Sequence, residues 1–347
     1  MSRVCVVGCG VIGLSTAIVV QQSLNAHVTI IADKWSPHTT SDGAAGLVEC
    51  MLDNNTPQDH KQRDWILRTE KYLESLVRSE DTGAACVQIL SGYYLSKHNT
   101  QIGNLSQYVN GFRKLSIKEM AAYFPNYNNG WFVTMLQLEC HKYLPWLMNK
   151  FQEHGGIFIN RHINSLSEIA GEYDVVVNCT GLGARELGND PSVYPIRGQV
   201  IRVKAPWVKH FIIDIDVEDI SKDNYTLYII PCVDTVVVGG TLQKNNWNLE
   251  VDAVNRKDIW TNCSRMLPSI TMAEVDHEWV GLRPGRPTVR LERETKTIGH
   301  KTIQVVHNYG HGGRGVSMHW GCANDAANLV KDAINDNTKK NILKSKI

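Results

Sequence analysis

The sequence predicts an α/β fold with two interleaved domains, one built on a parallel sheet and one on a mixed, antiparallel-rich sheet. Three observations lead to this prediction in a chain of 347 residues, which is long enough for two domains. A strand, a glycine turn and a helix occur near each end of the chain. Asp174–Gly181 has the continuous hydrophobicity of a central parallel strand. Residues 197–239 contain a run of short strands separated by turn signals.

The N-terminal unit has the form of a dinucleotide-binding fingerprint. The strand Arg3–Val7 runs into a GxGxxG sequence, Gly8-Cys9-Gly10-Val11-Ile12-Gly13. A helix over Leu14–Leu24 and a second strand, His27–Ala32, follow. The glycines allow a tight turn and the close approach of a pyrophosphate, and an acidic residue, Asp33, stands 20 positions after the last glycine for the ribose hydroxyls. The pattern predicts a Rossmann-type domain, and it does not choose between NAD and FAD.

The loop after this unit favours a flavin nucleotide. Residues Thr39–Leu47 are small and rich in hydroxyls, at a point where an NAD-binding domain normally continues with another helix. Small side chains allow a flat ring to lie on the backbone, and hydroxyls can bind phosphate or ribitol oxygens. A simple polar turn is the alternative, and Gly46 with its two neighbouring alanines argues against it.

The remaining elements alternate between helices and strands. A helix over Gln58–Arg78 has one apolar face, and the capping box Ser116–Glu119 begins a short helix that ends before Pro125. We expect strands at 86–95, 131–140, 197–204, 211–215, 226–230, 235–239 and 277–281, and helices at 143–152 and 252–266. The central strand at 174–181 returns the chain to the first domain. The acidic segment Asp216–Asn224 is either a lid over a pocket or an exposed loop.

The most informative stretch lies near the C-terminus. A buried strand with Val305 and Val306 ends in His307-Asn308-Tyr309-Gly310-His311-Gly312-Gly313-Arg314-Gly315, and residues 326–334 have the apolar spacing of a helix. Four glycines in six residues let a ligand approach main-chain N–H groups that side chains would screen. A strand, a glycine turn and a helix N-terminus form an anion-binding arrangement. A turn that only reverses the chain would not need these interleaved polar residues.

These segments closely resemble those of the D-amino-acid oxidase and D-aspartate oxidase family of FAD enzymes, and the resemblance covers nearly the whole chain. We therefore expect a Rossmann-type FAD-binding domain interleaved with a mixed, antiparallel-rich substrate-binding domain. The FAD-binding domain is predicted at residues 1–80, 141–195 and 288–340, the substrate-binding domain at 81–140 and 196–287, and a tail at 341–347. The residues implied to bind FAD are Gly8, Gly10, Val11, Ile12, Gly13, Asp33, Lys34, Thr39, Thr40, Ser41, Ala45, Gly46, Leu47, Gly312, Gly313, Gly315, Val316 and Ser317.

The resemblance also implies which residues bind the substrate. Arg283 would bind the α-carboxylate, and a guanidinium can do so through two parallel hydrogen bonds, as an ammonium cannot. Tyr228, which periodicity alone would place in the core, would bind the same carboxylate, and the Gly313 carbonyl would accept a hydrogen bond from the amine. Tyr225 would line the pocket mouth. The implied reaction is hydride transfer from Cα of a D-amino acid to the flavin, hydrolysis to a 2-oxo acid and ammonia, and reoxidation by dioxygen to hydrogen peroxide.

The side chain of the substrate is harder to predict. Several stretches, such as Ala205-Pro206-Trp207-Val208, are more similar to the D-aspartate branch, but Leu242 stands where those enzymes carry an arginine. A side-chain carboxylate in a desolvated pocket needs a cation. We therefore expect D-aspartate or D-glutamate as substrate with Arg314 as the cation, Lys222 and His60 being the other candidates. A broad oxidase of neutral D-amino acids is the alternative, and an NAD-dependent dehydrogenase or a nucleotide-sensing module is disfavoured.

The composition argues against other classes of protein. Lys+Arg 36 against Asp+Glu 35 gives a net charge of +1, so we expect no nucleic-acid or membrane partner. The nine cysteines are scattered without a CxxC pair and predict reduced thiols, and the dispersed histidines give no metal-ligand spacing, so we expect no metal site. The C-terminal Ser345-Lys346-Ile347 is similar to the Ser-Lys-Leu signal. It predicts a peroxisomal import receptor as partner and the peroxisome as location, with the cytoplasm otherwise.

Overall fold

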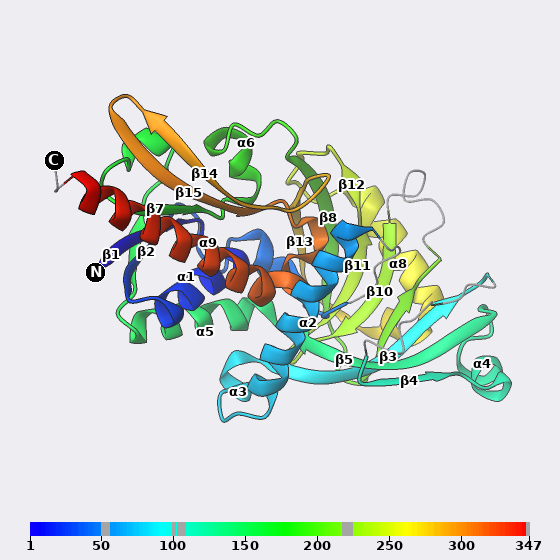
Figure 1. The fold of residues 1–347 in the computed structure, drawn as a ribbon. Helices are drawn as coiled ribbons and strands as arrows, with labels where there is room; N and C mark the ends of the chain where they lie inside the picture. The colour runs from blue at the N-terminus through cyan, green and yellow to red at the C-terminus, as the bar shows by residue number, and fades with distance from the viewer. Residues whose placement is uncertain (50–55, 99–101, 103–108, 217–224, 345–347) are drawn as a thin grey trace.

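Two β-sheets lie next to each other in the computed structural model, and the chain passes between them several times (Figure 1). The structure describes residues 1–49, 56–98, 102, 109–216 and 225–344. Lys222, the rest of segment 217–224 and Ser345-Lys346-Ile347 lie outside these residues, so the lid and the peroxisomal signal stay predictions. Within the described part of the chain, every helix is too short or too polar to cross a membrane.

Sheet A has six strands in the order β14-β15-β7-β1-β2-β6. Five of them run parallel, and β14 is antiparallel to β15. Their bounds are β1 Ser2–Val7, β2 Ala26–Ala32, β6 Ile157–Asn160, β7 Val175–Asn178, β14 Arg290–Ile298 and β15 Lys301–Tyr309. The predicted central strand, β7, lies between β1 and β15 and is fully buried. The predicted return of the chain to its first sheet is thus confirmed.

Helices α1 (Val11–Ser23), α5 (Cys140–Glu153) and α9 (Gly315–Lys344) pack together beside sheet A (Figure 1). Helix α2 (Pro57–Val77) contacts α9 on one side and sheet B on the other. It begins at Thr56, whose hydroxyl accepts the Asp59 N–H in a capping box. The other helices are α8 (Ala253–Met266) and the short α3 (Thr82–Ala85), α4 (Ile117–Tyr123) and α6 (Ala184–Leu187).

Sheet B has nine strands in the order β12-β8-β11-β10-β9-β3-β5-β4, with β13 also paired to β8. The pair β3–β9 is parallel and the other pairs are antiparallel, which confirms the predicted mixed sheet. The bounds are β3 Val87–Ser96, β4 Gly111–Lys114, β5 Asn129–Leu138, β8 Tyr194–Lys204, β9 Phe211–Asp214, β10 Tyr225–Pro231, β11 Val236–Thr241, β12 Gln243–Lys244 and β13 Glu274–Gly285. Helix α8 covers β10 and β11 and closes a separate core.

The structure differs from the sequence-based prediction in a few elements. Strands β4, β6, β12 and β14 were not predicted, and β13 continues through Arg283 and Pro284, which we had expected to follow the strand. Residues of β13 as far as Gly285 pair with β8. The described cysteines are free thiols as predicted, and all of them except Cys232 are buried. The exact limits of the two domains stay a prediction.

Candidate active site

The first glycine turn has no room for side chains. Gly8 follows β1 with φ +108°, and a Cβ there would lie 2.5 Å from the carbonyl oxygen of Cys179. A Cβ on Gly13 would lie 2.0 Å from the Gly8 carbonyl oxygen. These contacts hold the N-terminus of α1 directly against the carboxyl end of β1. Free N–H groups at that helix end can bind the phosphates of a nucleotide.

The hydroxyl-rich loop lies over this helix N-terminus. Ser41 Oγ accepts the Val11 N–H at 3.1 Å, and a Cβ on Gly10 would lie 3.2 Å from the same oxygen. Residues Thr40–Gly43 form a short 3₁₀ helix, η1, in which the Asp42 side chain is buried. The Asp42 carboxylate accepts hydrogen bonds from the Thr39 N–H at 2.9 Å and the Thr39 hydroxyl at 2.6 Å. The predicted phosphate-binding hydroxyls are thus brought to the fingerprint by a rigid turn.

The end of this loop is fixed to sheet B. The Gln137 side chain donates to the Ala45 carbonyl at 2.9 Å, and the Leu138 N–H donates to the Gly46 carbonyl at 3.0 Å. Gly46 has φ +74°, and a Cβ there would lie 1.7 Å from the Leu138 carbonyl oxygen. Leu47 forms a β-bridge with Gln137. The predicted cofactor loop therefore joins the two sheets.

The acidic residue after β2 lies at the same edge of sheet A. Asp33 and Lys34 are exposed there. Asp33 Oδ2 lies 2.7 Å from Nδ1 of His162, a partner that the sequence did not indicate. Since the side chain is on the surface, a ribose hydroxyl can approach it. Ile12, another predicted cofactor residue, is half-buried in the first turn of α1.

The second glycine turn has an open face. Strand β15 ends at Tyr309, residues Gly312–Arg314 form a 3₁₀ turn called η6, and α9 begins at Gly315. Gly312 has φ +57°, and a Cβ there would meet no atom within 4 Å. Carboxyl ends of β1, β7 and β15 lie at one edge of sheet A, so this open turn and the fingerprint share that edge. The backbone of both turns fits an extended dinucleotide with a flat ring.

Two further predicted residues follow in α9. Val316 is buried in the core shared with α1, so its contribution to the site is its backbone. The Ser317 hydroxyl accepts the Glu49 N–H at 3.1 Å. This bond ties the end of the hydroxyl-rich loop to the start of α9. Both segments that would contact the flavin are therefore connected to each other.

Arg283 connects sheet B to the second glycine turn. Its Nη1 donates to the Thr241 carbonyl at 3.1 Å. The guanidinium lies across Gly198, where a Cβ would come within 2.3 Å of Nη1. A Cβ on Gly313 would lie 3.5 Å from Arg283 Cδ. The arginine is thus held in one orientation next to the glycine that is predicted to bind the substrate amine.

Tyr228 lies beside Arg283. The tyrosine ring on β10 packs on β11, where a Cβ on Gly239 would come 2.4 Å from its Cζ atom. A Cβ on Gly240 would lie 2.8 Å from the Tyr228 hydroxyl oxygen, and Arg283 binds the carbonyl of the next residue, Thr241. Burial raises the pKa of Tyr228, and the positive charge of Arg283 lowers it. Arg283, Tyr228 and Gly313 are therefore gathered at one place from β13, β10 and the glycine turn.

Tyr225 is directed elsewhere. Its hydroxyl lies 3.0 Å from Asn255 Oδ1 and 3.0 Å from Asp258 Oδ2, both on α8. Burial raises the pKa of Tyr225 to about 12, and the Asp258 carboxylate adds to the shift. A neutral hydroxyl occupied by two acceptors fixes β10 to α8. Its predicted place at the pocket mouth is not supported by any contact with Arg283 or Tyr228.

The candidate side-chain cations lie near α2. Arg314 is exposed and its Nη1 lies 3.5 Å from Gln62 Oε1. Hydrogen bonds from Thr56 lower the pKa of Asp59, and the charge of Arg314 adds to this shift. His60 is exposed on the same helix. Leu242 directly follows Thr241, whose carbonyl binds Arg283. Among the described candidates, Arg314 is the one that lies in the glycine turn itself.

Glu49 is a residue of the site that the sequence reasoning missed. The Tyr94 hydroxyl donates to Glu49 Oε1 at 3.3 Å. Burial raises the pKa of Glu49, while the Tyr94 hydrogen bond and the Arg314 charge lower it. The Glu49 charge in turn raises the pKa of Tyr228. Glu49 is therefore coupled electrostatically to both the predicted substrate tyrosine and the predicted substrate cation. The signal for it was a charged residue two positions after the small, hydroxyl-rich loop Thr39–Leu47.

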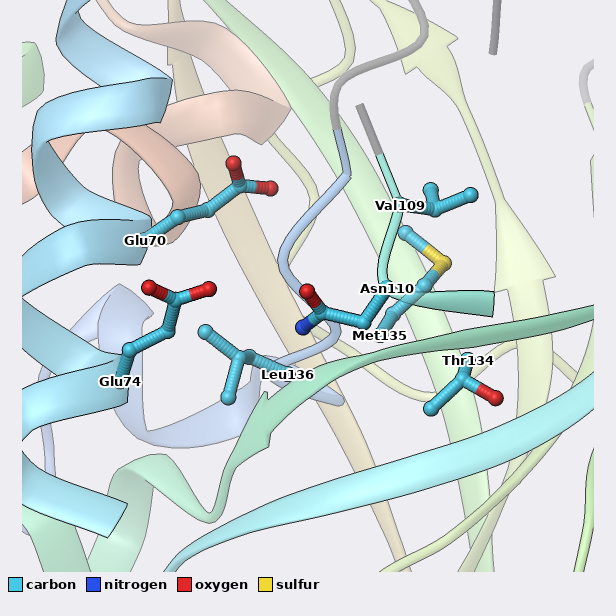
Figure 2. Close-up of a pocket in the computed structure, with 7 residues that line it drawn as sticks. All are labelled: Glu70, Glu74, Val109, Asn110, Thr134, Met135 and Leu136. Atoms are coloured by element: carbon cyan, nitrogen blue, oxygen red, sulfur yellow. The ribbon is translucent and has the colours of Figure 1, made fainter. Parts of the chain in front are cut away.

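A separate small cavity lies between α2 and β5. Figure 2 shows Glu70 and Glu74 projecting from α2 toward Asn110 and the β5 residues Met135 and Leu136. Its volume is about 20 Å³, room for one water and too little for an amino acid. Burial, together with the Glu74 charge, raises the pKa of Glu70 to about 7. This cavity belongs to the packing between α2 and sheet B.

The chain is similar in sequence to known proteins. Residues 3–329 match the family described as FAD dependent oxidoreductase. The chain is 41% identical over 336 residues to "D-aspartate oxidase" of Homo sapiens, with 96% of each chain covered. It is 36% identical to "D-amino acid oxidase" of Dugesia ryukyuensis, with 96% of this chain and 98% of the relative covered.

The fold also has solved counterparts. Glycine oxidase from Geobacillus kaustophilus superposes with a TM-score of 0.77 over 96% of this chain and 95% of that one, at 18% identity. At that identity the similarity shows the fold alone. Together with the matches in sequence, the glycine turns and the half-buried Arg283, it leads to one conclusion. The chain belongs to the FAD dependent oxidoreductase family, is an amino acid oxidase of the D-amino acid and D-aspartate oxidase type, and uses FAD as its cofactor.

Proposed function

We propose that this chain oxidises D-amino acids at Cα and prefers D-aspartate. The observation that carries the proposal is the position of Arg283, which is bound to the Thr241 carbonyl, packed on Gly313 and next to Tyr228. A fixed guanidinium beside a hydroxyl suits an α-carboxylate, because both can donate hydrogen bonds to it. The open face of the glycine turn lies directly beside these two groups.

Each residue has a separate task in this proposal. Arg283 and Tyr228 bind the α-carboxylate and thereby fix the distance of Cα from the glycine turn. The Gly313 carbonyl accepts a hydrogen bond from the amine, which favours the neutral amine that the reaction needs. Bound FAD supplies the oxidising group that accepts the hydride from Cα. Three fixed contacts around Cα orient its C–H bond, and orientation of this kind is a large part of the catalytic effect.

The preference for D-aspartate rests on Arg314. This arginine is a cation in the second glycine turn, and Glu49 and Gln62 help to hold it there. A side-chain carboxylate in the pocket would replace part of its lost hydration by contact with this guanidinium. The 41% identity to a relative named D-aspartate oxidase supports the same preference.

A second candidate function is oxidation of neutral D-amino acids. Glu49 favours it, because its ionised form acts on Tyr228 and would repel a second carboxylate on the substrate side chain. Leu242 adds an apolar group next to Thr241. In this case Arg314 only neutralises Glu49 and does not contact the substrate.

Peroxide production separates the two candidates. We would compare D-aspartate, D-alanine and L-aspartate with the wild-type holoenzyme, Arg314→Gln and Glu49→Gln. If D-aspartate is the substrate, R314Q should lower kcat/KM for D-aspartate by about 100-fold and change D-alanine less than about threefold. Lys61→Gln, which removes another charge of the α2 surface, is the matched control and should change neither.

The opposite result would favour the neutral enzyme. Wild type would then prefer D-alanine, R314Q would leave this preference unchanged, and Glu49→Gln would raise activity on D-aspartate by about tenfold. Full retention of D-aspartate activity in R314Q would contradict the role of Arg314. Absence of peroxide with both D-amino acids would contradict the proposed oxidation itself.

A further inference from the structure

Three side chains that could bind a metal meet at a point where the two sheets are connected. Glu139 and His141 lie at the junction between β5 and α5, and Asp234 lies in the hairpin between β10 and β11. One potential ligand atom from each residue lies within 4.8 Å of the other two. The cluster is separate from Arg283, Tyr228 and the glycine turns.

Glu139 has a buried oxygen that the described residues leave without a hydrogen bond. Its side chain is 1% exposed. Oε2 accepts the Val233 N–H at 3.0 Å and lies 3.6 Å from the Cys86 sulfur. Oε1 faces the cluster, 3.5 Å from His141 Nδ1, and has no hydrogen-bond partner among the described residues. An ionised carboxylate oxygen in such a position is unfavourable unless a donor or a cation approaches it.

The spacing fits a transition metal. Two ligands of a tetrahedral zinc ion with bonds of about 2.0–2.1 Å lie about 3.3 Å apart. The Glu139 Oε1 to His141 Nδ1 distance of 3.5 Å is close to this value without movement of either residue. Asp234 is on the surface with 59% of its side chain exposed, so it can rotate toward the other two and leave an entry path for an ion.

We propose that Glu139, His141 and Asp234 form a binding site for a divalent transition metal of the zinc class. One imidazole nitrogen and two carboxylate oxygens, with water in the fourth position, are a common zinc ligand set, and magnesium and calcium disfavour the imidazole. Asp234 has two carboxylate oxygens, so it can bind the ion and keep its pair with Lys142, whose Nζ lies 2.5 Å from Oδ2.

Two neighbouring cations lower the affinity that we expect of this site for a metal ion. Lys142 bonds to Asp234, and the charge of Arg202 acts on His141. Both repel an incoming cation, and the positive N-terminal end of α5 does the same. We therefore expect a dissociation constant on the order of micromolar, weaker than that of a structural zinc site.

The bound ion would link the two domains. Asp234 follows β10, the strand of Tyr228, whereas α5 packs on α1 of the nucleotide-binding side. Metal binding would hold the β10–β11 hairpin against the start of α5. The expected effect is a more stable holoenzyme, since a ligand that binds only the folded state shifts the unfolding equilibrium.

Titration of the FAD-loaded enzyme with zinc chloride tests this site. After treatment with EDTA and dialysis at pH 7.5, we expect one zinc per chain by calorimetry and a rise in Tm of about 3 °C at saturating zinc. The side chains of His141 and Asp234 both reach the surface. His141→Ala and Asp234→Asn should therefore keep their flavin, and each should weaken zinc binding at least about tenfold. His277→Ala is the matched control, because His277 Nδ1 lies 2.7 Å from Asp276 on the surface without a third ligand.

Several outcomes would overturn the proposal. Unchanged zinc affinity in both H141A and D234N would show that the ion binds elsewhere. X-ray absorption of the zinc complex should show nitrogen or oxygen neighbours at about 2.0–2.1 Å, and sulfur neighbours at about 2.3 Å would assign the ion to cysteines instead. If H277A lost as much zinc affinity as H141A, the zinc would be binding nonspecifically to surface histidines.

Discussion

The nucleotide-binding side and the substrate-binding side of this enzyme are built from different parts of the chain. Around the fingerprint and the hydroxyl-rich loop, the backbone is closely packed, and added Cβ atoms at Gly8, Gly13 and Gly46 would lie 1.7 to 2.5 Å from carbonyl oxygens. Around the substrate, contacts are made by side chains, chiefly Arg283 and Tyr228. A site made of backbone cannot change without loss of the fold. A site made of side chains can change its substrate by one substitution.

Substitution of Gly46 tests the backbone side most severely. A Cβ would meet the Leu138 carbonyl at 1.7 Å, so we expect Gly46→Ala to cost more than about 3 kcal/mol and to lose most of the bound flavin. Gly155→Ala is the control, because Gly155 has a similar φ of +81° with no atom within 4 Å of its Cβ and should cost about 1 kcal/mol. Flavin absorbance per chain and thermal unfolding measure both variants. Equal effects of the two would show that φ, and not the contact, sets the cost.

Arg283→Lys tests the side-chain side. The charge is kept and the two parallel hydrogen bonds are lost, so kcat/KM should fall by about 100-fold or more, for D-aspartate and D-alanine alike. Flavin content should stay at the wild-type level, because Arg283 is not among the residues predicted to bind the cofactor. If kcat/KM fell for only one of the two substrates, Arg283 would contact the substrate side chain. Loss of flavin would show that Arg283 also contributes to cofactor binding.

Glu70→Gln tests the packing between the two sides, where the smallest effect is expected. The pKa of Glu70 is raised from 4.5 to about 7, so the folded chain binds this proton more tightly than the unfolded chain. The resulting loss of stability is absent below pH 4.5, grows as the pH rises, and is complete above pH 7. The partly exposed side chain limits its size to on the order of 1 kcal/mol.

E70Q should therefore be more stable than wild type at pH 8 and equally stable at pH 4. Thermal unfolding at the two pH values measures this, with Glu80→Gln, a change at an exposed carboxylate, as the control. The same change in Tm at both pH values would contradict the raised pKa. Activity should be unaffected at either pH, because the cavity in Figure 2 is separate from Arg283 and Tyr228.

The backbone-built half of the site could be predicted because its signals are local. The GxGxxG sequence, the hydroxyl-rich loop and the second glycine turn are each contained in a few consecutive residues. Each was found at the carboxyl edge of sheet A or over it. The return of the chain to its first sheet was predicted from the apolar strand that the structure shows as β7.

Sequence patterns did not predict β14 or the end of β13, because their residues lack the usual pattern of a strand. Strand β14 has the sequence RLERETKTI, in which charged residues outnumber apolar ones, and it is a strand because it pairs with β15 at the edge of sheet A. Pro284 suggested that the strand before it had ended, since proline lacks an N–H, yet β13 continues to Gly285 beside β8. Pairing in the sheet decided both cases, and single-sequence periodicity does not contain it.

The remaining part of the site depends on long-range contacts. Glu49 belongs to the site through the hydrogen bond from Tyr94 on β3 and through the charge of Arg314. No spacing rule connects these positions. The same holds for Asp234, which meets Glu139 and His141 only because the β10–β11 hairpin folds against α5.

The strand order of sheet A also has a consequence for synthesis of the protein. β7 needs β15 as its neighbour, and β15 comprises residues 301–309 of a chain of 347. Until these residues leave the ribosome, the nascent chain carries a parallel sheet with an open, apolar edge, while much of sheet B has already emerged. Such an edge is open to wrong pairing with other chains. The nucleotide-binding sheet can therefore be completed only after every strand of sheet B has been synthesised.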